Sequence, residues 1–180
     1  LAGIDLTLPS RALALASLGQ EVQAGYLGAP EIERIYGLQG SVLDTIQASW
    51  VESVALGSGA TVTGGVSTFG AADDAVSTVE MADQLVLPLP GQEEDPEVAL
   101  DGADAVRAFR FTSPAGEGDA IDSYRIIAAA DASLIVVDVQ AAPSEAAAAE
   151  GALALARAQL SCLGGAGCEL PELPTELSGA

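Results

Sequence analysis

The feature that most constrains the fold is an alanine-rich segment at residues 146–163, which we expect to form the longest helix. The residues before it, 143–145, read Pro-Ser-Glu, a typical helix start. Its larger apolar side chains recur at helical spacing along one face: Leu153, Ala156, Leu160 and Leu163. A helix with one apolar stripe needs a second layer against which to bury it.

Strand-like segments supply that layer. Five stretches are rich in β-branched, aromatic or aliphatic residues, namely 45–56, 60–69, 106–111, 123–128 and 133–139. The last two form a hairpin around Ala130 and Asp131, and Gly64–Gly65 predicts a kink in the second. We therefore expect an α+β fold, with an antiparallel sheet of about five strands and helices packed on one of its faces.

The remaining segments complete this organisation. We expect short helices at 9–18 and 71–84, one or two helical turns at 31–36 and an extended stretch at 20–29. Residues 1–168 form a single domain, in which 88–97 is an exposed, acidic, proline-rich loop between two halves. Residues 169–180 form an extended C-terminal tail.

Charge excludes several functions. The chain has 26 acidic residues and six basic ones, all arginine, which gives a formal net charge of −20, and it has no histidine. Nucleic-acid binding needs basic clusters, and an anionic membrane surface would repel this chain. Mechanisms that use histidine or lysine are excluded, so no serine or threonine has a basic partner to activate it. We expect a protein that is not an enzyme and has no cofactor; a hydrolase that uses carboxylates is the alternative.

The acidic side chains fall mainly in expected loops, first turns of helices and the tail, whereas the expected strands are nearly free of them. A hydrophobic content of 49% and a mean hydropathy of +0.37 exclude intrinsic disorder. The acids therefore form a solvating coat over an apolar core. An acid-rich chain without lysine is consistent with a salt-adapted source, and equally with a GC-rich genome.

Two cysteines indicate the compartment. Cys162 and Cys168 enclose three glycines, which let the backbone curl and bring the two sulfur atoms together. We expect a disulfide formed in an oxidising compartment; two reduced, buried thiols are the alternative. Because the chain starts at Leu1, we favour removal of a signal segment over the alternative that the chain is a fragment.

Four residues are candidates for contact with a ligand or partner: Trp50, Tyr124, Arg110 and Arg125. Aromatic side chains often line ligand pockets, and the two arginines lie in expected strands where they could face a shallow groove. The alternatives are core packing for the aromatic residues and ordinary surface ion pairs for the arginines.

Carboxylates offer one weak metal candidate. Glu117, Asp119 and Asp122 lie in or beside a glycine-bearing loop and could supply oxygen ligands to calcium. The loop lacks the alternating spacing of a dedicated calcium cage, so a solvated loop is the favoured interpretation. The sequence shows no other metal site.

The order of strands, hairpin and closing helix resembles a known group. The segments are Val106–Phe111, Ser123–Ile127, Leu134–Val139 and Ala154–Gln159, and Leu13–Gly19 is similar to the opening of such domains. The group comprises extracytoplasmic domains of lipoproteins and of receptor kinases in high-GC bacteria, including the mycobacterial kinase sensor domain. Its members typically carry more cysteines. The resemblance implies secretion, with or without a lipid anchor upstream of Leu1, an α+β fold and a binding or scaffolding role, and it transfers no functional residue.

Together these observations predict a non-catalytic, secreted or lipid-anchored, extracytoplasmic domain. We expect it to bind a protein partner or a small ligand in the cell envelope, or to serve as an accessory subunit of an envelope assembly. No segment is expected to span the membrane, so an upstream anchor or a partner would provide any membrane association. The alternative is a carrier of an apolar or lipid ligand in a cavity between sheet and helices.

Overall fold

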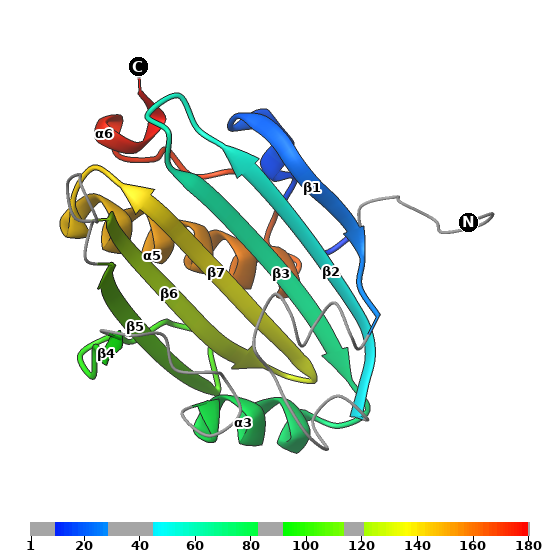
Figure 1. Ribbon diagram of the computed structural model, residues 1–180. Helices are drawn as coiled ribbons and strands as arrows, with labels where there is room; N and C mark the ends of the chain where they lie inside the picture. Colours follow the sequence, from blue (N-terminus) through cyan, green and yellow to red (C-terminus); the bar gives the residue numbers. More distant parts are fainter. Residues whose placement is uncertain (1–9, 29–44, 83–91, 114–120, 180) are drawn as a thin grey trace.

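The computed structural model describes residues 10–28, 45–82, 92–113 and 121–179. They form an α+β fold built on one antiparallel sheet (Figure 1). Its strands are β1 Gln20–Tyr26, β2 Ile46–Ala55, β3 Thr61–Phe69, β4 Gln92–Glu94, β5 Ala105–Ser113, β6 Ile121–Ala130 and β7 Ser133–Ala142. The helices are the 3-10 turn η1 Leu15–Ser17, α3 Ala72–Glu80, α5 Glu145–Leu163 and α6 Thr175–Ser178.

The seven strands lie in the order β1-β2-β3-β7-β6-β5-β4, and each is antiparallel to its neighbours. The five expected strands are present as β2, β3, β5, β6 and β7, so the antiparallel α+β prediction is confirmed. The count of five is wrong, because β1 and β4 add an edge strand on each side. Gly64 and Gly65 keep the β2 and β7 registers, so no register shift interrupts β3 at these glycines.

Helices cover both faces of the sheet, so the expectation of helices on one face is wrong. α5 packs on β6 and β7 over a core that includes Ile126, Ile135 and Leu155. α3 packs on the opposite face, where Val79 lies in a second core with Ile127. The alternation of side chains along β6 assigns successive residues to these two cores, as the period of two requires.

α5 is the longest described helix, as expected from the alanine-rich segment. Ser144 caps its start: the Oγ atom accepts a hydrogen bond from the backbone N–H of Ala147 at 3.2 Å. Small side chains let α5 lie close against the sheet, and Ala148, Ala152 and Ala156 are fully buried. No helix within the described ranges combines the length and apolarity needed to span a membrane.

The N-terminal segment differs from the expected helix at 9–18, of which residue 9 lies outside the described part. From residue 10 onward the chain forms a turn and then only η1. The buried carboxylate of Glu52 in β2 accepts hydrogen bonds from the backbone N–H groups of Leu15 and Ala16, at 2.9 and 2.7 Å. This tertiary contact overrides the helical preference of an alanine-rich sequence.

Two further expectations need correction. Within the expected loop 88–97, Gln92–Glu94 forms β4, and residues 88–91 lie outside the described part. The expected extended tail instead ends in α6, whose Leu177 is fully buried. Leu177 packs over Gly151 in α5, where an added Cβ atom would lie 2.4 Å from the Leu177 Cδ1 atom. The expected turns at 31–36 also lie outside the described residues.

Candidate functional site

The structure separates the four residues proposed from the sequence. Tyr124 and Arg110 are direct cross-strand partners on β6 and β5. Trp50 lies on β2, on the same α5-facing side of the sheet, but β3 and β7 lie between it and β6. Arg125 follows Tyr124 in β6 and therefore faces the other side. Only Arg110 and Tyr124 are brought together.

Arg110 and Tyr124 belong to a satisfied polar network at the β4–β5 edge. The Tyr124 hydroxyl donates to the Asp95 Oδ2 atom at 2.7 Å. Arg110 forms ion pairs with Glu145 at 3.3 Å and with Glu93 at 3.4 Å, and the Glu145 carboxylate is the main cause that raises the Arg110 pKa. Burial, followed by the hydrogen bond to Asp95, raises the pKa of Tyr124 well above its ordinary value. These contacts tie the sheet edge to the start of α5.

Arg125 lies in a buried polar row on the sheet face opposite α5. Its Nη2 atom donates to the Asp138 Oδ2 atom at 2.9 Å, and its Nε atom donates to Oδ1. Thr63 is the cross-strand neighbour of Asp138, and its hydroxyl lies 2.6 Å from that of Ser53. Because the polar groups of this row form hydrogen bonds with one another, we assign the row a structural role.

The calcium candidate is only partly described. Glu117 and Asp119 lie outside the described residues. Asp122 is described, and its Oδ1 atom accepts a hydrogen bond from the Thr112 hydroxyl at 3.1 Å. In the described ranges no group of three acidic or cysteine side chains is placed to hold a metal ion.

Trp50 lines a pocket at the end of the sheet near the last turn of α5. Its floor is made by α5-facing side chains of β1, β2 and β3. Tyr26 meets Trp50 edge to face with 5.2 Å between ring centres. This inner pocket has a volume of about 300 Å³, and its lining includes Arg11, Tyr26, Trp50, Val66, Thr68 and Leu163.

A wider, more polar groove adjoins the inner pocket, since both are lined by Arg11, Ser133 and Leu163. This outer groove has a volume of about 620 Å³ and adds Arg157 together with two acids, Asp101 and Asp131. We call the two parts together the α5-end groove. An apolar pocket with a few polar groups at its mouth is the usual form of a small-molecule site.

Trp50 carries an unused hydrogen-bond donor. Its side chain is 4% exposed, and its indole Nε1 is the one buried side-chain nitrogen or oxygen atom without a partner among the described residues. A buried donor left unpaired lowers stability by about 1–3 kcal/mol. Strain, an ordered water or a functional contact explains such an exception in an otherwise satisfied structure.

Two arginine side chains that form no ion pair within the described residues also line the groove. Arg107, Arg110 and Arg125 each form an ion pair with an acidic side chain. Arg11 and Arg157 line the α5-end groove, and neither guanidinium has an ion pair or hydrogen bond within the described part of the chain. Both side chains are exposed, and they are the two described arginines without a carboxylate partner in a chain of net charge −20.

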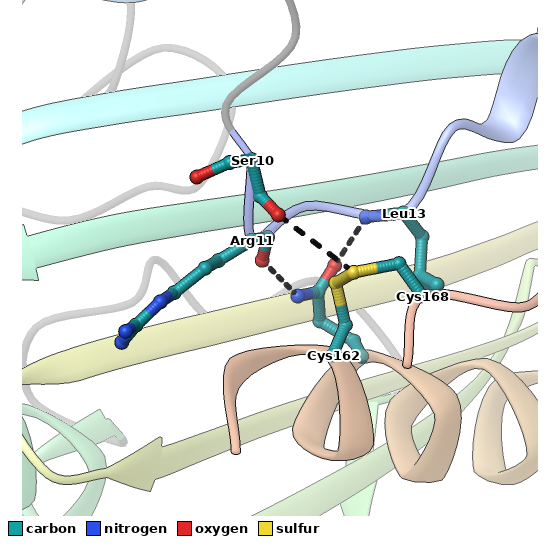
Figure 2. Close-up of a disulfide and its surroundings, with 6 residues drawn as sticks. Ser10, Arg11, Leu13, Cys162 and Cys168 are labelled. Carbon is teal, nitrogen blue, oxygen red and sulfur yellow. Dashed lines mark hydrogen bonds between the residues drawn. A yellow bond between two sulfur atoms is a disulfide. The ribbon is translucent and has the colours of Figure 1, made fainter. Parts of the chain in front are cut away.

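The backbone that carries Arg11 is held from α5 (Figure 2). The Gln159 Nε2 atom donates to the Arg11 carbonyl at 2.8 Å, and its Oε1 atom accepts from the Leu13 N–H at 3.0 Å. The Cys162–Cys168 disulfide adjoins this contact, with the Cys168 Sγ atom 3.8 Å from the Ser10 carbonyl oxygen. Figure 2 shows the Arg11 side chain extending away from the disulfide.

Of the residues that line the groove, the sequence made Trp50 a candidate but gave no indication of Arg11, Leu163 or Arg157. These residues share no sequence motif, because they come from separate elements that meet near the C-terminal end of α5. The one available signal was the helix end, which the sequence places correctly at residue 163.

The space between the sheet and the body of α5 is filled. The enclosed void there, lined by Trp50, Gly64 and Leu155 among others, measures about 10 Å³, which is room for one water molecule. A cavity for a lipid chain, as the carrier alternative requires, is therefore not found under the body of α5 in the described residues.

The sequence matches no protein-family model and no curated protein. Among solved structures, the chain is similar to the extracellular domain of PknH from Mycobacterium tuberculosis. The TM-score is 0.54 at 12% identity, and the alignment covers 92% of this chain and 100% of that domain. At this identity the similarity concerns the fold, and at that level it supports the resemblance to mycobacterial kinase sensor domains.

Proposed function

We propose that this chain is a non-catalytic, extracytoplasmic binding domain whose α5-end groove takes a small ligand. The observation that carries the proposal is the groove itself, with the aromatic pair of Tyr26 and Trp50 and the unpaired Arg11. Arg107, Arg110 and Arg125 each form an ion pair away from the groove, so we assign them a structural role. The groove joins an apolar surface to unpaired polar groups, which is what ligand recognition requires.

Two observations support an extracytoplasmic location. The Cys162–Cys168 disulfide is of the kind that persists in oxidising compartments. The fold is similar to that of an extracellular domain. The same proposal includes secretion, with or without a lipid anchor. It also includes a role as an accessory subunit of an envelope assembly.

A protein partner is the second candidate, and the sheet edge favours it. Within the described residues β1 pairs only with β2, so its other side is an edge. Val22, at the bulge of β1, is 64% exposed. An exposed edge strand can accept a strand from another chain.

Native mass spectrometry tests the groove. The purified domain is incubated with a small-molecule extract of the source cell envelope, beside a Thr68→Phe variant that fills the inner pocket. The proposal expects a stoichiometric adduct on the wild-type domain that the variant loses. An adduct of equal intensity on both proteins would place the ligand elsewhere, and a wild-type domain without an adduct would favour the edge-strand candidate.

A further inference from the structure

Resting on the proposed function, we propose that the α5-end groove binds a soluble monoanionic amphiphile, with its apolar part in the inner pocket and its carboxylate at Arg11. The two parts of the groove differ in charge, and this difference identifies the ligand class. Arg11 is the only charged residue that lines the inner pocket among the described residues. Asp101 and Asp131 line the outer groove only.

The inner pocket suits an apolar body. Its lining includes Tyr26, Trp50, Val66 and Leu163, and about 300 Å³ lies at the small end of the range for ligand sites. Trp50 and Val66 are cross-strand partners, so the sheet register fixes this surface before any ligand arrives. Tyr26 is 41% exposed although it is aromatic, which leaves ring surface free for an apolar ligand.

The mouth of the pocket suits a single negative charge. An arginine pairs with a carboxylate through charge-assisted hydrogen bonds, and Arg11 has no competing acidic partner. Arg157 adds a second positive charge in the outer groove, where Asp101 and Asp131 oppose it. These two acids disfavour a multiply charged group such as a phosphomonoester, so the arrangement selects a monoanion.

A membrane surface is a poor source for this ligand. The chain carries a net charge of −20, and an anionic bilayer would repel it. Arg11 and Arg157 are the two unpaired arginines of the described residues, too few to offset that repulsion. The ligand is therefore expected to arrive as a dissolved molecule.

Three probes with one chain length and different head groups test the ligand class: decanoate, decanol and decyltrimethylammonium, each below its micelle concentration. Trp50 is the only tryptophan, so its fluorescence reports on the inner pocket without a label. We expect decanoate to bind about tenfold more tightly than decanol, and decyltrimethylammonium to bind most weakly. Calorimetry gives the same affinities independently of fluorescence.

Two variants and a matched control locate the contact. Arg11→Gln should weaken decanoate binding about tenfold and leave decanol binding unchanged, because only the charged head contacts the guanidinium. Arg110→Gln removes an exposed arginine outside the groove and should change neither affinity. Thr68→Phe should abolish binding of all three probes. Circular dichroism and urea unfolding confirm that each variant is folded.

The outcomes separate the ligand class from the groove. Binding that Thr68→Phe abolishes, but that does not favour decanoate or does not respond to Arg11→Gln, would overturn the anionic ligand and keep the groove. If Thr68→Phe leaves binding unchanged, or if no probe binds saturably, both the anionic ligand and the groove as its site are overturned. Decanoate that binds only in phosphatidylglycerol vesicles, with the protein recruited to them, would overturn the soluble source.

Discussion

Gln159 holds Arg11 across the fold: the Gln159 Nε2 atom lies 2.8 Å from the Arg11 carbonyl oxygen, although 148 positions separate the two residues. The same side chain accepts a hydrogen bond from the Leu13 N–H. The position of the unpaired arginine at the groove mouth therefore depends on a residue inside α5. The groove is consequently a property of the folded chain that no local segment contains.

Replacing Gln159 with leucine should loosen this arrangement. The Leu13 N–H and the Arg11 carbonyl lose their partners, and the free energy of unfolding should fall by about 1–3 kcal/mol. Affinity for decanoate should fall as well, because Arg11 is no longer held in place. Urea unfolding and Trp50 fluorescence measure the two effects. Gln140→Leu, at an exposed position of β7, is the control and should change stability by less than about 0.5 kcal/mol.

The fold was predictable from sequence where residues that favour strands continue over long stretches. β2, β3, β5, β6 and β7 each carry enough β-branched, aromatic and aliphatic residues to identify them. β4 was not predictable, because Gln92–Glu94 is short and polar and exists only by pairing with β5. The helix predicted at 9–18 was wrong for a similar reason. The contact between Glu52 and η1 joins residues 37 positions apart, so the local sequence does not reveal it.

The buried pair of Arg125 and Asp138 should be the ion pair most sensitive to substitution. Arg125→Met leaves the Asp138 carboxylate buried without its partner and should lower the free energy of unfolding by about 3–5 kcal/mol. Glu94→Gln, in the more exposed pair with Arg107, should cost no more than about 1 kcal/mol. Equal costs for the two substitutions in urea unfolding would contradict the structural role of the buried row.

The disulfide should stabilise the chain modestly, because the loop that it closes is short. Cys162 and Cys168 are six positions apart, for which loop-closure entropy gives about 2–3 kcal/mol. Reduction should lower the urea midpoint accordingly and should speed amide exchange at Leu13, which lies beside the bridge. Intact mass before and after reduction checks that the bridge exists. A midpoint that does not respond to reductant would contradict this account.

Tyr124 should make the fold sensitive to alkali. Because its pKa is raised in the folded state, its contribution to stability is complete below its unfolded pKa of about 10 and is lost as pH rises above that value. Tyr124→Phe should flatten the decline of unfolding free energy above pH of about 10. Tyr26→Phe removes an exposed phenol as the control. A decline of the same steepness in wild type and Tyr124→Phe would refute the assignment.

The site was only partly predictable. Trp50 was a candidate because aromatic side chains often line ligand pockets, whereas Arg11 and Arg157 carry no pattern that marks them as unpaired. Pairing is a tertiary property: the sequence offers 26 acids for six arginines, and only the fold shows which of the described arginines form no ion pair. The groove likewise depends on where α5 ends relative to the strands.

The most direct measurement is the indole N–H signal of Trp50 in a ¹H–¹⁵N correlation spectrum, because the chain has a single tryptophan and hence a single such signal. The account predicts that decanoate shifts this signal with a saturating curve whose affinity equals that from calorimetry, and that Thr68→Phe abolishes the shift. If decanoate binds by calorimetry while the Trp50 signal stays fixed, the ligand lies outside the α5-end groove and the account is wrong.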